Sequence, residues 1–386
     1  MGVEDGGAGA TGGAGGEGAR TSRAGRVRRV LLALFVAVAV VVPVSAFARP
    51  RIPAPAPASL APVTAATLDE AYAANRANAA EAARMAAAHG DRKRAASDRS
   101  MAAPSRQFLS FDGRGTGQAV EVFGDLAHAD RVAVLVPGSD TTLDTYDRFR
   151  AGATALMHEI ATRTPAVHTA PHTAPHTAPH TAAHTAPRTA ERTAPRTAER
   201  TTPRTAVVAW LGYETPRTIS TTVLTTGRAG SAAPRLAAFV RELRGLAGRD
   251  VRISLLCHSY GSVVCARAAE RSDHRGAGLQ GEARVDDLVL VGSPGTGADS
   301  AADLHTTARV WAARGSDDWI ADVPHASADL FGTTVGFGTD PVSPAFGARV
   351  FAAGDGGHSD YFLPGSVSLD NLARIVLGDT SEVTRA

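Results

Sequence analysis

Short apolar runs alternate with amphipathic segments along most of the chain. The runs expected to form strands cover residues 131–136, 206–211, 251–257, 288–291, 308–313 and 349–352. Apolar positions at helical spacing predict helices over 143–163, 233–246 and 368–377. Because strands that alternate with helices build parallel sheets, this order predicts an α/β fold with a mostly parallel central sheet and helices on both faces.

Two further runs, 107–111 and 119–123, alternate apolar and polar residues. Such alternation is typical of half-exposed strands, so we expect two antiparallel strands at the edge of the sheet. With these strands included, the main domain is expected to extend over residues 105–380.

An alanine-rich segment precedes this domain and predicts a helix. Thr67 and Glu70 form a capping box, the helix covers 68–88, and Gly90 ends it. The polar residues 90–104 predict a loop or a weak helix. We therefore expect a helical segment at 65–104 that packs on the outside of the main domain.

The amino end combines a basic and an apolar segment. Residues 1–29 are a Gly-rich leader, expected to be disordered, that ends in several arginines. The apolar stretch 30–48 follows and ends in Ala-Phe-Ala, a pattern typical of a signal peptide. The competing interpretation is an uncleaved transmembrane helix that anchors the protein. Both place the main domain outside the cytoplasm, either secreted or membrane-anchored, behind a Pro/Ala linker at 49–64.

Residues 166–205 contain a four-residue repeat, His-Thr-Ala-Pro and later Arg-Thr-Ala-Pro or Arg-Thr-Ala-Glu. Proline at nearly every fourth position forbids a helix, and the repeat has almost no apolar side chains to bury. It is therefore expected to be a disordered insertion at the surface. Its histidines would spiral around a polyproline helix instead of sharing one face, so no specific metal site is expected there.

The segment 255–264 reads Leu-Leu-Cys-His-Ser-Tyr-Gly-Ser-Val-Val and joins a buried strand to a helical pattern. A strand, a sharp turn with a central serine, and a helix are the layout of a nucleophile elbow. The turn strains the backbone of Ser259 and needs small neighbours, which here are Gly261 and Cys257. An ordinary turn serine is the competing interpretation, and features further along the chain favour the nucleophile.

A serine nucleophile needs a base, and a carboxylate that orients the base, on later loops at the carboxyl ends of strands. The loop after the next-to-last strand offers Asp318, which lies beyond the turn, with Asp317 as the runner-up. The glycine-rich loop after the last strand offers His358. His325 precedes the last strand and is poorly placed. His258, beside the serine, is expected to pack or to bond to the backbone.

An oxyanion hole needs two hydrogen-bond donors. The backbone amide of Tyr260, the residue after the nucleophile, is expected to be one of them. The other is expected from Gly138 or Ser139, which follow the first central strand.

The cysteines Cys257 and Cys265 flank the elbow. A disulfide in an oxidising compartment is one interpretation, and two small buried residues are the other. Their spacing is not that of metal ligands, so the sequence predicts no metal and no cofactor.

Composition adds limits on size and partners. A chain of 386 residues with 44% hydrophobic residues can bury a sizeable core. A formal net charge of +2 gives no reason to expect nucleic acid. The expected partner is a small-molecule acyl substrate, with membrane contact only through the amino-terminal segment if it stays uncleaved.

Four motifs together resemble an uncharacterised alpha/beta-hydrolase family, known as a domain of unknown function, over about residues 68–378 without the repeat. The motifs are Val136-Pro137-Gly138-Ser139, Trp210-Leu211-Gly212-Tyr213, Cys257-His258-Ser259-Tyr260-Gly261-Ser262 and Gly357-His358-Ser359-Asp360-Tyr361. The resemblance implies the alpha/beta-hydrolase fold and the positions of the triad, and it implies no substrate.

These patterns favour an exported serine hydrolase that uses a Ser-Asp-His triad on an ester or another acyl bond. A peptidase would differ only in the leaving group. A non-catalytic binding protein of the same fold at the cell envelope is an alternative from another class. Phe331, Phe337 and Phe346 either line an acyl pocket or belong to the core.

Overall fold

The computed structural model describes residues 52–164, 203–220, 225–270, 278–323, 325, 327–330 and 333–386. The predictions made for the leader, for the apolar segment 30–48 and for nearly all of the repeat therefore fall outside the described residues. Among the helices of the described residues, none is both long and apolar enough to cross a membrane.

Eight strands form one sheet in the order β1-β2-β4-β3-β5-β6-β7-β10. Their bounds are β1 Phe108–Asp112, β2 Gln118–Phe123, β3 Arg131–Val136, β4 Thr205–Leu211, β5 Arg252–His258, β6 Asp287–Val291, β7 Arg309–Ala313 and β10 Arg349–Val350. β2 runs antiparallel to both β1 and β4, and all neighbours from β4 to β10 are parallel. The mostly parallel sheet expected from the sequence is thus confirmed.

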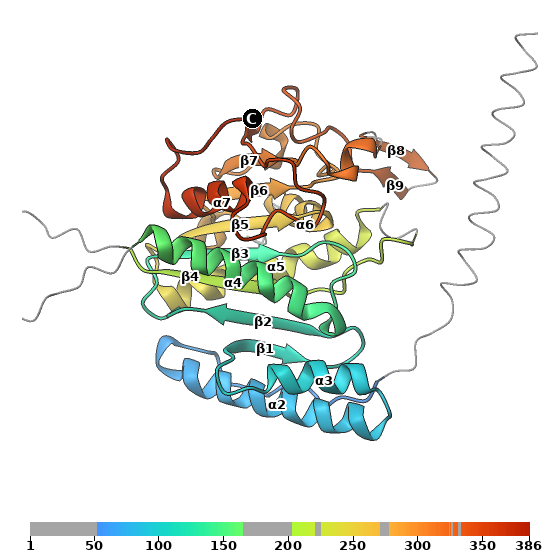
Figure 1. Cartoon of the computed structure of the whole chain (residues 1–386), viewed down its shortest axis with the longest axis vertical. Coiled ribbons are helices and arrows are strands. Elements are labelled where there is room, and N and C mark those ends of the chain that lie inside the picture. The colour runs from blue at the N-terminus through green and yellow to red at the C-terminus, as the bar shows by residue number, and fades with distance from the viewer. Residues whose placement is uncertain are drawn as a thin grey trace, which may run out of the picture. The chain divides into compact units, whose positions relative to one another are not determined.

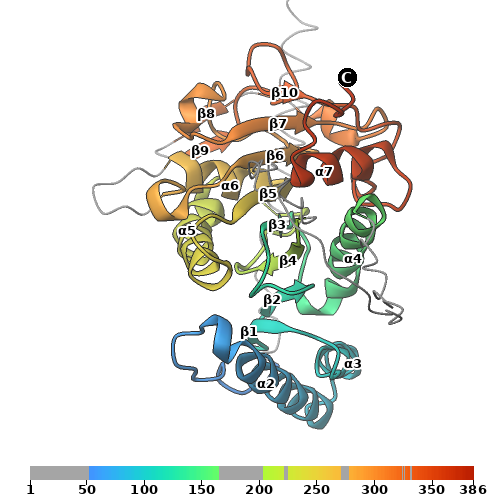
Figure 2. The same ribbon diagram turned by 90° about the vertical axis from the view of Figure 1, so that its left-hand side faces the viewer.

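Helices cover both faces of the sheet, as Figures 1 and 2 show. Their bounds are α4 Tyr146–Arg163 and α7 Val367–Leu377 on one face, and α5 Gly227–Ala247 and α6 Tyr260–Glu270 on the other. Strand side chains alternate between the faces, so β3 gives Val132, Val134 and Val136 to the core beneath α5 and α6. Its Ala133 and Leu135 join the core beneath α4 and α7.

Two amino-terminal helices, α2 (Leu68–Ala88) and α3 (Arg92–Met101), lie beside β1 at the edge of the sheet (Figure 1). α2 has the bounds expected from the sequence. Its buried Asn75 donates to the backbone carbonyls of Phe108 and Leu109 at 2.9 and 3.1 Å, which covers the free edge of β1. α3 forms where a loop or weak helix was expected, because Asp91 caps it and buried Arg94 ties it to Asp144.

β2 differs from the half-exposed edge strand expected from its polar alternation. It lies between β1 and β4, and its central residues are buried. Glu121, the polar residue that suggested a solvent face, is 1% exposed. Its carboxylate is paired with the guanidinium of Arg106, also buried, and lies 3.4 Å from Nε of Arg150. A paired charge can occupy a core position that an unpaired one cannot.

Three other elements depart from expectation. α5 begins at Gly227 instead of residue 233 and carries Pro234 in its interior, although proline usually marks a helix start. A two-stranded antiparallel hairpin, β8 (Ser327–Leu330) and β9 (Thr333–Gly336), was not predicted. The last strand is shorter than expected: the Phe351 amide still donates to the Ala312 carbonyl on β7, but the next amide, of Ala352, donates to the Thr384 carbonyl near the carboxyl end. The remaining short 3₁₀ helices are η1 Ala65–Thr67, η2 Leu143–Thr145, η4 Gly281–Ala283, η5 Ala302–Leu304 and η6 Trp319–Asp322.

Replacing Glu121 with glutamine removes the countercharge of the buried Arg106 guanidinium. We expect the free energy of unfolding, measured by denaturant titration, to fall by about 3 kcal/mol or more. Asp112→Asn is the matched control, because Asp112 pairs at 2.7 Å with an Arg114 side chain that is 57% exposed, and should cost under about 1 kcal/mol. Equal losses of unfolding free energy in the two variants would contradict the conclusion that Glu121 is buried as the countercharge of Arg106.

Candidate active site

Ser259 lies at the sharp turn between β5 and α6 and has a φ of 55°. Few residues other than glycine adopt this left-handed conformation, so the backbone is strained there. The Ser259 amide donates to the Val291 carbonyl on β6 at 3.0 Å. A Cβ atom at Gly261 would lie 2.5 Å from the Val136 carbonyl oxygen, so only glycine fits. The strained serine and the small neighbour expected at this turn are both present.

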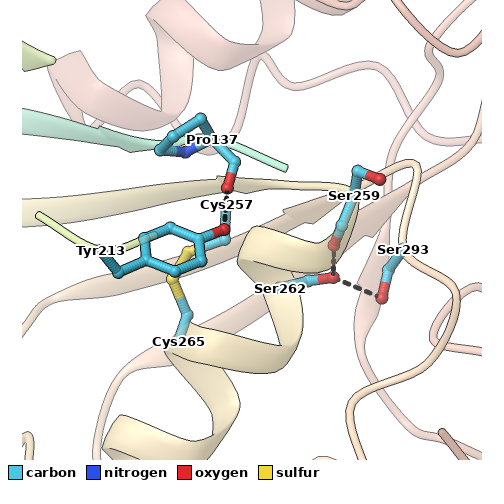
Figure 3. Close-up of a disulfide and its surroundings, with 7 residues drawn as sticks. All are labelled: Pro137, Tyr213, Cys257, Ser259, Ser262, Cys265 and Ser293. Atoms are coloured by element: carbon cyan, nitrogen blue, oxygen red, sulfur yellow. Dashed lines mark hydrogen bonds between the residues drawn. A yellow bond between two sulfur atoms is a disulfide. The ribbon is translucent and has the colours of Figure 1, made fainter. Parts of the chain in front are cut away.

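A disulfide joins Cys257, at the end of β5, to Cys265 in α6 (Figure 3). Of the two interpretations left open by the sequence, the structure has the cross-linked one. The two cysteines are eight positions apart in the sequence, and Ser259 lies between them. The strand and the helix on either side of Ser259 are thus covalently fixed to each other.

Two serines support the turn from below, as Figure 3 shows. The Ser262 hydroxyl donates to the Ser259 carbonyl, and its oxygen lies 2.7 Å from the Ser293 hydroxyl oxygen. Both hydroxyls are buried, so these bonds replace water that cannot reach them.

His358 and Asp318 come from loops that follow β10 and β7, and the structure brings both to Ser259. The His358 Nε2 atom lies 2.9 Å from the Ser259 hydroxyl oxygen. The His358 Nδ1 atom lies 2.9 and 3.1 Å from the two Asp318 carboxylate oxygens. Because an ionised carboxylate only accepts, Nδ1 carries the hydrogen, and in the neutral ring Nε2 is free to accept from the serine.

Asp318 is 2% exposed and caps the short helix η6. Burial alone would raise the pKa of its carboxyl group, but hydrogen bonds from His358, from the Tyr361 hydroxyl at 2.5 Å and from the Ile320 amide at 2.9 Å outweigh it. The pKa of Asp318 is therefore lowered, and the carboxylate stays ionised at neutral pH.

Tyr361 is a site residue whose role the sequence did not reveal. Its buried hydroxyl donates to Asp318 and accepts from the Gly315 amide at 3.1 Å. It thereby fixes the carboxylate against the loop that follows β7. A Cβ atom at Gly292 would lie 2.9 Å from the Tyr361 ring, so a glycine makes room for this side chain. The one signal in the sequence was its place in the Gly-His-Ser-Asp-Tyr motif.

His258 lies beside Ser259 but points to the backbone of the histidine loop. Its Nε2 atom donates to the His358 carbonyl at 2.7 Å, and the two rings lie 4.9 Å apart. Desolvation and the neighbouring His358 lower the pKa of His258 to about 4, so the ring is neutral at neutral pH. The expectation that this histidine packs and bonds to the backbone is confirmed.

The rival candidates lie away from the serine. Asp317 is exposed, and its carboxylate is 3.4 Å from the hydroxyl of Ser316. The His325 Nε2 atom lies 3.8 Å from a carboxylate oxygen of Asp340, which pairs with Arg314. Neither makes a contact with the Ser259 hydroxyl.

Gly138 abuts Ser259, since a Cβ atom there would lie 2.5 Å from the Ser259 Cβ and 3.0 Å from its Oγ. The preceding carbonyl, of Pro137, accepts from the Tyr213 hydroxyl at 2.7 Å (Figure 3). The Tyr260 side chain turns elsewhere and donates to the Thr225 carbonyl, so its backbone amide is what remains for an oxyanion. The oxyanion role of Gly138, Ser139 and Tyr260 stays a prediction.

Two of the three candidate acyl-pocket phenylalanines belong to the core. Phe337 and Phe346 are 5% and 1% exposed, and Phe337 packs edge-on against Tyr260 with ring centroids 5.9 Å apart. Phe331 lies outside the described residues. Within the described ranges, no group of three or more His, Cys, Asp and Glu side chains is arranged to hold a metal ion.

The lowered pKa of His258 predicts a pH dependence of stability. The folded ring stays neutral down to about pH 4, whereas in the unfolded chain histidine takes up a proton below about 6.5. The stabilisation is therefore complete above pH 6.5 and is lost as the pH falls toward 4. We expect the urea midpoint of the wild type to drop across this window and the drop to be smaller in His258→Gln, which keeps a donor but does not titrate. Equal drops of the urea midpoint in the wild type and in His258→Gln would contradict the assignment of this pH dependence to His258.

Comparison with curated proteins finds two similar chains, the uncharacterized proteins Rv2079 and MT2140 of Mycobacterium tuberculosis. Each is 32% identical over an alignment of 202 positions that covers 45% of this chain. The match spans 29% of the length of these relatives.

Among solved structures, a predicted CIB-like hydrolase from Thermoplasma acidophilum has a TM-score of 0.36 and 12% identity over 72% of this chain and 97% of that one. An esterase from Rhizomucor miehei has a TM-score of 0.38 and 9% identity over 72% of this chain and 83% of that one. Likenesses this distant carry no conclusion about activity.

A family model described as alpha/beta hydrolase matches residues 112–179 and 172–328, more than half of the chain. The match includes Ser259 and Asp318 and ends before His358. The matched residues contain β2 to β7 and the turn between β5 and α6. The chain belongs to the alpha/beta-hydrolase family.

Proposed function

We propose that the protein is a serine hydrolase that cleaves an ester or another acyl bond through Ser259, Asp318 and His358. The observation that carries the proposal is the unbroken line of hydrogen bonds from the Ser259 hydroxyl through the His358 ring to the Asp318 carboxylate. It begins at a serine held in a strained turn. Neither feature is needed to bind a ligand without reaction, which favours an enzyme over a binding protein.

In the proposed reaction the Ser259 oxygen attacks the carbonyl carbon, and its proton passes to Nε2 of His358. The Asp318 carboxylate stabilises the imidazolium that results, and its lowered pKa keeps it ionised for this task. Nε2 then gives the proton to the departing alcohol, or to an amine in a peptidase. Water repeats the sequence on the acyl-enzyme and releases the acid.

The negative charge that develops on the attacked carbonyl oxygen needs hydrogen-bond donors on the side of Ser259 opposite to His358. The amide of Tyr260, together with that of Gly138 or Ser139, is proposed for this role. The absence of a side chain at Gly138, which abuts Ser259, lets the substrate carbonyl approach. Each such donor is typically worth about 3 kcal/mol of transition-state stabilisation.

We also propose that the enzyme works outside the cytoplasm, either released or held by its amino-terminal segment. The basic and apolar segments at residues 1–48 support this, because they are typical of an exported chain. The disulfide between Cys257 and Cys265 supports it independently, because disulfides persist in oxidising compartments.

Labelling with a fluorophosphonate tests the nucleophile. We expect the wild type to form one covalent adduct, located on Ser259 by mass spectrometry, and to hydrolyse p-nitrophenyl acetate. Ser259→Ala should lose the adduct and about a million-fold in turnover while its circular dichroism stays that of the wild type. A wild type that takes no label and hydrolyses neither esters nor peptides would leave a binding protein as the correct interpretation.

The two adjacent aspartates give a matched pair for testing the acid. The asparagine of Asp318→Asn has no negative charge to pair with the Nδ1 hydrogen of His358. Turnover should therefore fall about ten-thousand-fold, as for the equivalent change in a serine protease. Asp317→Asn changes an exposed side chain and should stay within about tenfold of the wild type. Steady-state kinetics on one ester compare them, and the reverse order would move the acid to Asp317.

The disulfide predicts a thiol count and a stability change. Protein purified from an exporting host without reductant should show no free thiol on titration in denaturant. Reduction should lower the free energy of unfolding by roughly 2–4 kcal/mol. The Cys257→Ala, Cys265→Ala double variant is the control and should be insensitive to reductant. Two free thiols in the exported wild type would contradict the cross-link.

A further inference from the structure

Most of the large apolar side chains that stay exposed in the described residues lie on segments that follow strands ending at the edge of the sheet with the candidate active site. Among the described residues they are Leu60, Ile219, Trp319, Leu363 and Val367. All except Leu60 lie on segments that follow β4, β7 or β10. The carboxyl ends of these parallel strands share one edge of the sheet, and Ser259, Asp318 and His358 lie at the same edge.

Trp319 is the member of this group whose ring contacts His358. Its side chain is 49% exposed, although both sequence neighbours, Asp318 and Ile320, are buried. The indole ring lies 4.7 Å from the ring of His358, centroid to centroid. Since His358 Nε2 is 2.9 Å from the Ser259 hydroxyl, a group attached to the attacked carbonyl has this apolar surface within reach.

Ile219 is tied to the loop that carries Gly138. The backbone amide of its neighbour Thr218 donates to the Asp140 carboxylate at 3.1 Å, and the Asp140 amide donates to the Pro216 carbonyl at 2.9 Å. These bonds hold the segment with a 78% exposed isoleucine beside the proposed oxyanion loop.

Leu363 stands on the same loop as His358. Its amide donates to the Asp360 carbonyl at 3.0 Å, and the Asp360 carboxylate accepts from the Gly357 amide at 2.8 Å. The leucine is 51% exposed on this turn. Apolar side chains therefore stand on segments linked to the oxyanion loop, to the acid and to the base.

The charges at this edge disfavour an anionic ligand. Asp317, Asp322 and Asp355 are exposed on the loops after β7 and β10, and the loop after β4 exposes Glu214 as well as Arg217. Acidic groups thus outnumber basic ones among the exposed side chains of these described loops. A substrate that carried its own carboxylate would be repelled there.

We propose that the substrate is an uncharged ester with a long apolar chain, and that Trp319 is the specificity-determining side chain against which this chain lies. The inference rests on the proposed serine hydrolase function. Each methylene group that is fully buried on binding contributes about fourfold in affinity, so a chain of several methylenes that covers the indole and its apolar neighbours gains strongly over an acetyl group.

The test compares kcat/KM for p-nitrophenyl acetate and p-nitrophenyl octanoate, both below the micellar range. We expect the wild type to prefer octanoate by about tenfold or more, since even half-buried methylenes add up to that. Trp319→Ala should lower the octanoate-to-acetate ratio at least about fivefold, and Trp319→Phe should restore most of it. Leu60→Ala, which changes an exposed apolar side chain away from the site, should keep the wild-type ratio.

A second arm tests the charge. An ester of the same length whose chain ends in a carboxylate should react at least about tenfold more slowly than its neutral counterpart. Equal rates for the two esters, a wild type that prefers acetate, or a ratio unchanged by Trp319→Ala would each overturn the inference while leaving the serine mechanism intact. Failure of the hydrolase proposal is distinguishable, because Ser259 would then take no fluorophosphonate and no ester would react.

Discussion

The backbone turn at Ser259 is the constraint on which the rest of the site depends. A left-handed conformation at a residue with a side chain costs about 1–3 kcal/mol and persists only when its surroundings fix it. Here the amide is bonded to β6, the carbonyl to Ser262, and Gly261 lies against the end of β3. The disulfide Cys257–Cys265 ties the two flanking elements together. The strain is thus offset by contacts from three strands and a helix.

A second consequence of the turn is that the serine can reach side chains distant in sequence. Asp318 and His358 stand on separate loops, and each is held by a partner that is not itself in line with the serine. Tyr361 fixes the carboxylate from one side, and His258 fixes the backbone of the histidine loop from the other. Because a buried carboxylate is stable only when its lone pairs are satisfied, these partners are as much a requirement of folding as of chemistry.

The central strands and the elbow could be predicted because their signals are local, namely apolar runs and one sharp turn. Glu121 could not be placed, because the arginines that allow its burial come from other parts of the chain. The role of Tyr361 could not be predicted either, because a tyrosine in a motif does not reveal which group its hydroxyl will bond to. The start of α5 at Gly227 was missed because residues 227–232 carry little apolar signal, and Pro234 lies in the helix interior, a position that proline disfavours.

The two halves of the site reverse the usual distribution of polar and apolar groups. Below the serine, polar side chains are buried and hydrogen-bonded, whereas beside it Trp319 exposes half of its surface to water. Electrostatic interactions between Asp318 and His358 strengthen when water is excluded from the reacting atoms. An apolar group laid against the indole would exclude that water. On the proposed function, the polar half of the site is complete in the protein alone, and the substrate completes the apolar half.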